Sequence, residues 1–308
     1  MCLVSVAPVI YEHPLAYLLG IEGIALLRSF TGEGESDHAF VEARIAEIRR
    51  LLDDESLASA AVEVVRVETV EGYRIWSDTY DAPNSAFDFD EPLVKAIVDT
   101  LPVGVALDAA CGTGRVAASL AARGHHVLGV DSSPDMLARA RERVPKGEFR
   151  LGELAGLPVA DDAVDLIVCS LALTHVPSLG PVMSEFSRVL RPGGHLVISD
   201  IHAEGVGRGV IPPVRRPDGA RARVASYRHL TGDYLRAALP VGLQVRRCEE
   251  PRMSMADRPG DTAGEPATLG PWDLWPWCLS ALAPEAAKAA VAGVPAMVIW
   301  HFQLGHPQ

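Results

Sequence analysis

The chain has no run of lysines and arginines, and its 308 residues carry a formal net charge of −12. Nucleic acid is therefore not an expected partner, because phosphate groups are bound by clustered cations. The five cysteines form no C-x-x-C pair, and an odd, scattered set of this kind indicates free thiols in a reducing compartment. The sequence also contains no internal repeat, and its 48% of apolar residues suffice for a sizeable core.

The sequence has no segment typical of a leader or a membrane span. The N-terminal stretch MCLVSVAPVI lacks both a basic head and a full apolar core. The apolar run Leu15–Leu27 is interrupted by Glu22 and two glycines and is too short to cross a bilayer. We therefore expect a soluble, cytoplasmic protein.

Residues 14–70 are predicted to be mainly helical, with the turn-rich stretch TGEGES separating two helices. Apolar residues recur at helical spacing along one face of the second helix, at Val41, Ile45, Ile48 and Leu52. We assign residues 1–72 to an N-terminal helical arm. It is either a packing appendage or a lid or dimer element over an active site.

From about residue 93, apolar strands alternate with helices. The predicted strands are VGVALDA, HVLGVD, EFRLG, VDLIVCSLAL and GHLVISD, and the predicted helices are 114–123, 134–143 and 180–190. Helix 231–239 and the strands GLQVRRCEE and AMVIWHFQL continue the pattern. Nearly continuous apolar strands separated by helices are typical of a parallel sheet covered on both faces.

Two segments rich in glycine and proline, 203–228 and 251–295, interrupt this alternation and are predicted to be accessory caps or loops. The second contains PWDLWPWC, with three of the five tryptophans. These tryptophans either line an apolar pocket for an aromatic ligand, together with Met253 and Met255, or anchor a long irregular loop. The sequence leaves both interpretations open.

The chemically informative stretch is LDAACGTG, residues 107–114, between a strand and a helix. The first N–H groups of a helix have no partner within it, and Gly112 and Gly114 have no Cβ to keep a ligand away from them. Asp131 ends the next strand, where an acid accepts hydrogen bonds from ribose hydroxyls. The stretch lacks the three-glycine pattern of dinucleotide sites and places Asp108 where a pyrophosphate would be repelled. An adenosine compound with an ammonium group and no phosphate, S-adenosylmethionine, fits these residues.

Four stretches resemble, in order and spacing, the successive motifs of class I S-adenosylmethionine-dependent methyltransferases: LDAACGTG, GVDSSPDML, LGELAGLPVADDAVDLIVCSLALTHV and RVLRPGGHLVISD. The resemblance covers residues 73–202 and departs from the family at Ala110, where many members carry glycine. It implies an α/β fold with a Rossmann-like, doubly wound sheet of seven mostly parallel strands. We assign this domain to residues 73–308, with insertions at 203–228 and 251–295.

The resemblance also implies a set of cofactor contacts. Asp108 and the backbone of Ala109, Gly112 and Gly114 hold the methionine end, and Asp131 binds the ribose. Further implied contacts lie beside the adenosine, at the adenine edge, beneath the sulfonium and in the segment WSDTYD before the core: Ser132 and Met136; Glu153 and Leu154; Cys169, Ser170 and Leu171; Trp76 and Tyr80.

Methyl transfer is an in-line displacement at the sulfonium methyl group, and a base helps where the attacking atom carries a proton. Bases are expected at the carboxyl ends of the strands. A lone histidine is more often structural, but several candidates gather at this edge, in order of preference His175, His229, Tyr227 and His202, with Tyr73 and Tyr80 before the core. Asp200 is expected to fix a loop or to orient a histidine. No H-x-x-H motif or acid pair has useful local spacing, so we expect no metal.

The layout YRIWSDTYDAPN, LALTHV and SDIH is also similar to that of bacterial secondary-metabolite methyltransferases, including enzymes that methylate C3 of an indole in tryptophan-derived cyclic dipeptides. This similarity implies a Tyr/His pair that deprotonates the indole N–H while C3 attacks the methyl group. We therefore expect a small aromatic natural product as substrate, and a homodimer through the arm is a further hypothesis. The alternatives are O-methylation of a polyketide or phenolic compound, and a cofactor-binding cyclase that transfers no methyl group.

Overall fold

The structure is a computed structural model that describes residues 9–32, 37–77, 80–81, 85–252 and 268–306. The chain forms two compact units, and each is drawn from several parts of the sequence. The larger comprises Glu68–Arg208, Ala225–Pro251 and Pro295–Gln308. The smaller comprises Met1–Val67, Gly209–Val224 and Arg252–Val294.

The larger unit is built on a seven-stranded sheet with the strand order β10-β11-β7-β6-β3-β4-β5. Its strands are β3 (Val105–Ala109), β4 (His126–Asp131), β5 (Glu148–Leu151), β6 (Val164–Ser170), β7 (Leu190–Ile201), β10 (Leu243–Glu249) and β11 (Met297–Leu304). Strands β3 to β7 pair in parallel, whereas β11 is antiparallel to both neighbours. The strand order reverses between β3 and β6, and ligands of open α/β sheets bind at such a point, outside the carboxyl ends of the strands.

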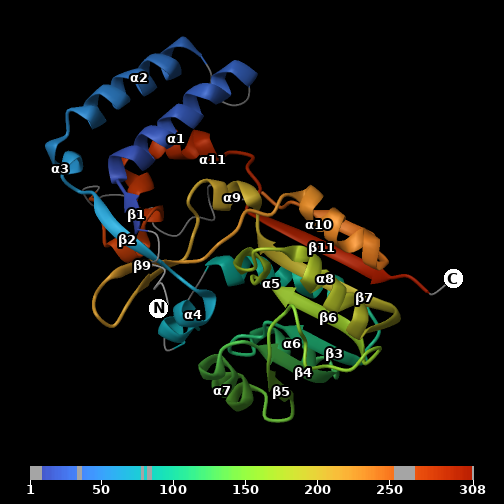
Figure 1. The fold of residues 1–308 in the computed structure, drawn as a ribbon. Coiled ribbons are helices and arrows are strands. Elements are labelled where there is room, and N and C mark those ends of the chain that lie inside the picture. The colour runs from blue at the N-terminus through green and yellow to red at the C-terminus, as the bar shows by residue number, and fades with distance from the viewer. Residues whose placement is uncertain (1–8, 33–36, 78–79, 82–84, 253–267, 307–308) are drawn as a thin grey trace, which may run out of the picture. The chain divides into compact units, whose positions relative to one another are not determined.

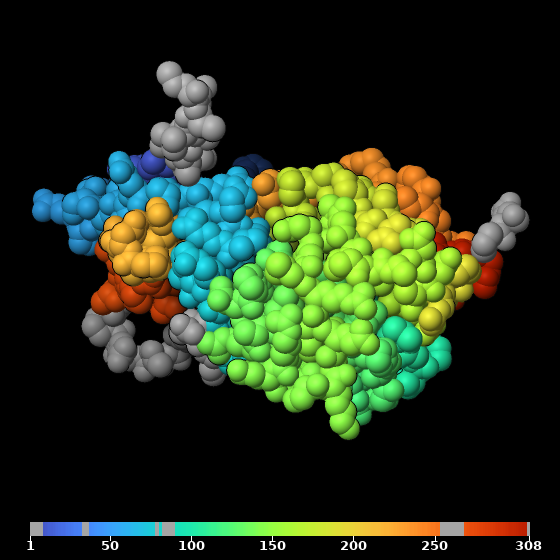
Figure 2. Space-filling model, turned by 60° about the horizontal axis from the view of Figure 1, so that its bottom comes forward, coloured from blue at the N-terminus to red at the C-terminus, as the bar shows by residue number. Residues whose placement is uncertain are grey.

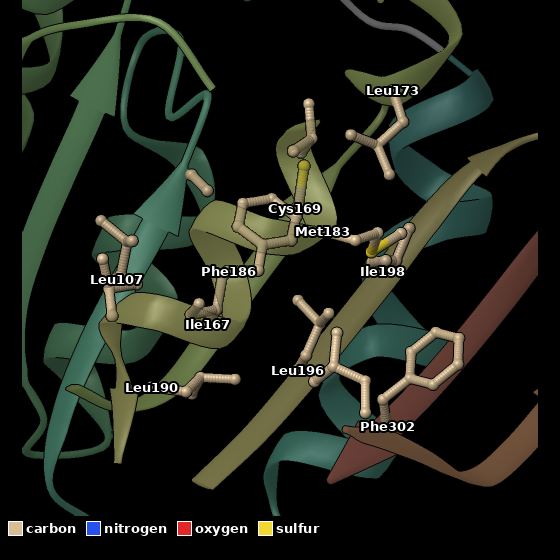
Figure 3. Close-up of a cluster of buried hydrophobic side chains, with 14 of the residues drawn as sticks. Leu107, Ile167, Cys169, Leu173, Met183, Phe186, Leu190, Leu196, Ile198 and Phe302 are labelled. Carbon is tan, nitrogen blue, oxygen red and sulfur yellow. The ribbon is translucent and has the colours of Figure 1, made fainter. Parts of the chain in front are cut away.

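Helices cover both faces of this sheet (Figure 1). These helices are α5 (Ser85–Val98), α6 (Arg115–Ala122), α7 (Pro134–Arg143), α8 (Leu179–Val189) and α10 (Thr231–Ala238). The larger unit also contains α4 (Thr69–Trp76) and α9 (Ala203–Gly207). One buried cluster joins α8 to the strands through Phe186, Leu107 and Ile167, as Figure 3 shows. A second buried cluster joins α5 and α6 to the opposite face through Val94 and Leu120. The expected Rossmann-like, doubly wound sheet of seven mostly parallel strands is confirmed.

The smaller unit contains a second sheet with the order β1-β2-β9-β8. Its elements are β1 (Val9–Glu12), α1 (Pro14–Arg28), α2 (His38–Leu52), α3 (Glu55–Ala58), β2 (Val62–Val67), β8 (Pro213–Arg215), β9 (Arg221–Val224) and α11 (Pro284–Val291), with short 3-10 turns. Helices α1 and α2 occupy much of the stretch that was expected to be helical, but Val62–Val67 is a strand. The run VEVVRV favours a strand because its valines are β-branched, and Val64 and Val67 are buried.

The apolar run Leu15–Leu27 lies in α1, and Glu22, the charged residue within it, has a structural role. Glu22 is fully buried and accepts a hydrogen bond from Arg44 Nη1 of α2 at 3.1 Å. Burial raises the pKa of Glu22 to about 7, although Arg44 opposes this shift. Among the helices within the described ranges, none combines the length and the apolar character that a membrane crossing requires.

The tryptophan-rich segment supports the core of the smaller unit. Trp272 and Trp275 are each only 5% exposed and pack with Val64 and Leu279. The guanidinium of Arg223 lies 5.0 Å from the Trp272 ring and also binds Glu12 through two hydrogen bonds of 2.7 and 2.8 Å. These two tryptophans therefore anchor an irregular segment, in agreement with one of the two interpretations above. Met253 and Met255 lie outside the described residues.

Candidate active site

The corner between β3 and α6, residues 110–114, requires backbone conformations that residues with side chains disfavour. Ala110, Gly112 and Gly114 have φ values of 60°, 51° and 82°. A Cβ on Gly114 would lie 3.1 Å from the Cα of Ala140 on α7, so this glycine serves both the left-handed conformation and the close packing of α6 on α7. Ala110 has the left-handed conformation although it is not a glycine, and this conformation costs about 1 kcal/mol of strain.

The carboxylates of two aspartates hold this corner by accepting hydrogen bonds from backbone N–H groups. Asp108 is 2% exposed, and its Oδ2 accepts the Ala117 N–H of α6 at 2.8 Å. Asp131 accepts the N–H groups of Gly112 and Ser133, each at 2.8 Å, on different carboxylate oxygens. Sequence reasoning assigned Asp131 to the ribose and missed its bond to Gly112. A carboxylate oxygen accepts more than one hydrogen bond, so both roles are compatible.

Buried or half-buried carboxyl groups lie at the carboxyl ends of β3, β4 and β7, at Asp108, Asp131 and Asp200. Burial raises the pKa of Asp108 and of Asp200 to about 7 in each case, and it also raises the pKa of Asp90 and Asp131. Arg115 pairs with Asp90, at 2.7 Å. A positively charged ligand would favour the ionised form of these groups. The group of acids, together with the small residues at the corner, therefore fits the sulfonium and ammonium charges of S-adenosylmethionine.

A cluster of aromatic rings comes from α4 and the residues after it. Tyr73 lies with its ring centroid 5.5 Å from Trp76, 5.7 Å from Tyr80 and 5.3 Å from His175. Tyr80 lies beside the corner, because its Cε1 is 3.9 Å from the position that a Cβ on Gly112 would occupy. The implied cofactor contacts Trp76 and Tyr80 are thus close to each other, and Tyr80 is close to the glycine corner.

Tyr73 and His175 form a hydrogen-bonded pair across 102 positions of sequence, with 2.9 Å between Tyr73 Oη and His175 Nε2. His175 Nδ1 lies 2.7 Å from the carbonyl oxygen of Ala225. A carbonyl only accepts hydrogen bonds, so Nδ1 carries the proton and Nε2 accepts the Tyr73 hydroxyl. Burial lowers the pKa of His175 and raises that of Tyr73 well above its usual value. The pair therefore rests as neutral tyrosine and neutral imidazole.

Sequence reasoning placed Tyr73 before the core without giving it a partner. The spacing of Tyr73 and Trp76 at i and i+3 is the signal that would have grouped these two, because residues at these positions share one face of a helix. Tyr80 lies beyond the end of α4, so helical spacing does not account for its place in the cluster.

The turn that carries His175, Leu173–His175, is fixed by its neighbours. Asp200 Oδ2 accepts the Thr174 N–H at 2.6 Å, and the Tyr227 N–H donates to the Thr174 carbonyl oxygen at 2.7 Å. His229 Nε2 donates to the carbonyl oxygen of Val176 at 2.8 Å. The candidates Tyr227 and His229 thus lie on the segment that supports the His175 turn.

The fourth candidate base, His202, caps α9. Its Nδ1 accepts the Glu204 N–H at 3.1 Å, and its Nε2 lies 3.3 Å from a carboxylate oxygen of Glu250. These contacts give His202 a structural role at the end of β7, and its role as a base stays a prediction.

The other implied cofactor residues differ in burial. Met136, Ala109 and Cys169 are fully buried, and Cys169 points into the hydrophobic cluster between β6 and α8 (Figure 3). Only its backbone is therefore available beneath a sulfonium. Ser170 Oγ accepts a hydrogen bond from Ser199 Oγ at 3.0 Å, and Leu171 has a φ of 55°. Ser132 and Leu154 are half-buried, whereas Glu153 is exposed.

Within the described ranges, no group of three or more histidine, cysteine or acidic side chains is arranged to hold a metal ion. The buried thiol of Cys111, within the corner, has a pKa raised by burial. It therefore packs as a small apolar group, and we assign no chemistry to it.

Comparison with known proteins agrees with this geometry. Residues 107–198 match the family model described as a methyltransferase domain. An arsenite methyltransferase of Halobacterium salinarum is 39% identical over 115 residues, which are 35% of this chain and 29% of that protein. The methyltransferase GfsG of Streptomyces halstedii is 36% identical over 143 residues, which are 43% of this chain and 51% of that protein. The chain thus spans only about a third to a half of the length of such relatives.

A solved complex of the Haloferax volcanii Trm112 methyltransferase activator and a putative methyltransferase contains a chain of similar fold, with a TM-score of 0.53 and 20% identity. The match covers 77% of this chain and 99% of that chain. The solved structure shows a likeness of fold. Because the glycine corner and the central strands coincide with the matched family model, residues 107–198 carry a methyltransferase domain whose cofactor is S-adenosylmethionine.

Proposed function

We propose that the chain transfers the methyl group of S-adenosylmethionine to a small aromatic acceptor and that Tyr73 and His175 remove the acceptor's proton. The observation that supports this most directly is the neutral pair joined by the 2.9 Å contact between Tyr73 Oη and His175 Nε2. It includes the first candidate base and adjoins the aromatic cluster that reaches Gly112.

When bound, S-adenosylmethionine supplies a methyl group on a sulfonium, which a nucleophile attacks in line with the departing sulfur. Asp108 and Asp131 hold the positively charged and ribose parts of this cofactor. Tyr73 accepts the acceptor's proton while its own hydroxyl proton passes to His175 Nε2. The resulting imidazolium keeps its Nδ1 proton on the Ala225 carbonyl oxygen. Burial disfavours this charge, so His175 releases the proton to solvent after the methyl transfer, and the pair returns to its neutral state.

The most specific acceptor we propose is C3 of an indole in a tryptophan-derived compound such as a cyclic dipeptide. A planar, apolar ring suits the cluster of the Tyr73, Trp76 and Tyr80 rings, in which Tyr73 and Trp76 pack edge to face and Tyr80 is tilted against both. An indole N–H also needs the kind of base that a Tyr/His pair provides. The names of relatives do not select a substrate, because they include arsenite, malonyl-[acyl-carrier protein] and demethylmenaquinone methyltransferases.

O-methylation of a phenolic compound or polyketide is the second candidate function, and the same observation supports it. The pair deprotonates a phenol as directly as an indole. A cyclase that binds the cofactor without transferring methyl is the remaining alternative.

The test combines S-adenosylmethionine labelled with ¹³C on the methyl group with tryptophan-containing cyclic dipeptides and with phenols. Release of S-adenosylhomocysteine measures turnover, and the carbon chemical shift distinguishes a C–CH3 product from an O–CH3 product. We expect a C–CH3 product from the indole. Cofactor binding without release of S-adenosylhomocysteine for every acceptor would refute methyl transfer and favour the cyclase.

We further propose the wider organisation that the sequence predicts. Residues 1–72 act as an arm to the cofactor-binding domain 73–308, and a homodimer forms through this arm. A cytoplasmic location is supported by the free thiols of Cys111, Cys169, Cys248 and Cys278. Sedimentation of the intact chain tests the dimer, which a monomer at micromolar concentration would contradict.

A further inference from the structure

We propose that Arg143, Thr113 and Asp81 form a latch that positions the aromatic cluster against the glycine corner and thereby slows release of the cofactor. Arg143 and Asp81 are positioning residues, because they act through Tyr80 and Thr113. The latch concerns the binding of the cofactor, so it does not depend on which acceptor is methylated.

The three side chains close a ring of hydrogen bonds. Arg143 donates from Nη2 to Asp81 Oδ2 at 2.7 Å and from Nη1 to Thr113 Oγ1 at 2.8 Å. Arg143 Nη1 also lies 3.0 Å from the Thr113 carbonyl oxygen. Thr113 Oγ1 in turn donates to Asp81 Oδ1 at 2.7 Å. Each member thus contacts the other two.

The ring joins three separate segments of the larger unit. Asp81 directly follows Tyr80, Thr113 lies between the two glycines of the corner, and Arg143 is the last residue of α7. Figures 1 and 2 show α4 and the α7 region side by side, and the two helices are in contact. The latch therefore ties Asp81, next to Tyr80, to both the corner and α7.

The burial of Thr113 makes this ring more than a surface ion pair. The side chains of Arg143 and Asp81 are 32% and 37% exposed, and an ion pair at that exposure contributes little by itself. Thr113 is only 1% exposed, so the ring is anchored inside the corner. Burial opposes ionisation of Asp81, but hydrogen bonds from Thr113 and Arg143 lower its pKa below the usual value. The carboxylate is thus held in the charged form that accepts both donors.

The consequence for the cofactor follows from the position of Tyr80. This residue lies beside Gly112 and packs on Tyr73, and it is the direct neighbour of Asp81. Release of Asp81 frees Tyr80 from the corner while the strands and α6 keep their positions. The cofactor would then lose the contact with Tyr80 that the latch maintains beside Gly112.

The test compares Arg143→Leu and Asp81→Asn with the unmodified chain. We expect the Kd of S-adenosylhomocysteine, measured by calorimetry, to rise about tenfold in each variant, or about 1.4 kcal/mol. Its dissociation rate should rise by a similar factor. In the protein without cofactor, amide hydrogen exchange in α4 should accelerate, which reports on the latch independently of turnover.

Arg141→Leu is the matched control. Arg141 lies on the same helix and donates to the Phe149 carbonyl oxygen at 3.1 Å, away from Asp81 and Thr113. The charge-exchanged pair Asp81→Arg with Arg143→Asp should restore part of the lost affinity, because Thr113 Oγ1 both donates and accepts.

Two results would overturn the latch: unchanged affinity and exchange in Asp81→Asn, or an equal loss in Arg141→Leu. Should Arg143→Leu not fold, Asp81→Asn decides, since it retains the bonds between Arg143 and Thr113. Because none of these measurements uses an acceptor, failure of the latch and failure of the proposed methyl transfer are distinguished.

Discussion

Replacement of Tyr73 by phenylalanine is the sharpest test of the proposed chemistry. The change removes one oxygen and keeps the ring that packs on Trp76, Tyr80 and His175. It also abolishes the hydrogen bond between Tyr73 Oη and His175 Nε2. The variant therefore separates the proton-transfer role of the hydroxyl from the packing role of the ring.

The expected fall in kcat follows from the proposed role of the Tyr73 hydroxyl as part of the general base. A positioned general base contributes about 10²- to 10⁴-fold to a rate. We therefore expect kcat to fall by roughly that factor, which equals about 2.7 to 5.5 kcal/mol of transition-state stabilisation. Loss of the hydroxyl also leaves the Nε2 of His175, a residue only 8% exposed, without its partner. That costs about 1–3 kcal/mol of folding free energy.

The assay measures single-turnover release of S-adenosylhomocysteine, with cofactor affinity and melting temperature recorded in parallel. We expect affinity for S-adenosylhomocysteine to stay within about twofold, because the lost hydroxyl bonds to His175 and not to the corner. Tyr11→Phe, at a position that is 69% exposed in the smaller unit, controls for the substitution itself. His175→Ala should reproduce the loss of turnover with cofactor affinity nearly intact.

Wild-type turnover in Tyr73→Phe would refute the base assignment. A loss of cofactor affinity as large as the loss of rate would refute it in a different way, since the hydroxyl would then support binding and not proton transfer.

Three further predictions concern the corner. Asp131→Ala should weaken cofactor binding at least tenfold, about 1.4 kcal/mol, by calorimetry, and unchanged affinity would remove the ribose assignment. Because the folded state raises the pKa of Asp108 from 3.8 to about 7, it binds this proton more tightly than the unfolded chain does. The stability of the cofactor-free protein should therefore fall as pH rises from about 4 to about 7, while cofactor binding strengthens. The measurement is the melting temperature at several pH values in that range. If the melting temperature of Asp108→Asn falls with pH as much as that of the unmodified chain, the prediction is wrong. Gly114→Ala should destabilise the fold by about 2–4 kcal/mol, as left-handed strain adds to a Cβ contact of 3.1 Å with Ala140. Gly209→Ala shares the φ of 82° but meets nothing within 4 Å, so equal losses of denaturation free energy in the two variants would show that the contact is irrelevant.

The carboxyl groups at the sheet edge make these predictions interdependent. Asp90, Asp108 and Asp200 are buried and Asp131 is half-buried, and each has a pKa raised by burial. A cationic ligand offsets their mutual repulsion. The cofactor is therefore expected to raise the melting temperature by a larger amount as the pH rises through about 7, because Asp108 and Asp200 ionise over that range.

The sequence alone determined the architecture of the larger unit and the location of its corner. The strands β3, β4 and β6 and the helices α6, α7 and α8 lie within a few residues of their predicted bounds. Both signals are local: the apolar period distinguishes strand from helix, and glycine marks the left-handed turn. The smaller unit was less predictable, because Met1–Val67 joins Gly209–Val224 and Arg252–Val294 in one unit. No local pattern links stretches so far apart in sequence.

Only the tertiary structure decided which side chains act on one another. Tyr73 meets His175 across 102 positions, and Asp81 meets Arg143 across 62. Asp131 turns out to bind the Gly112 N–H, and Cys169 to point into the core. The physical reason is that hydrogen bonds depend on separations of about 3 Å between particular atoms. Periodicity places a residue on a face of an element, but the packing of several elements fixes the distances between their side chains.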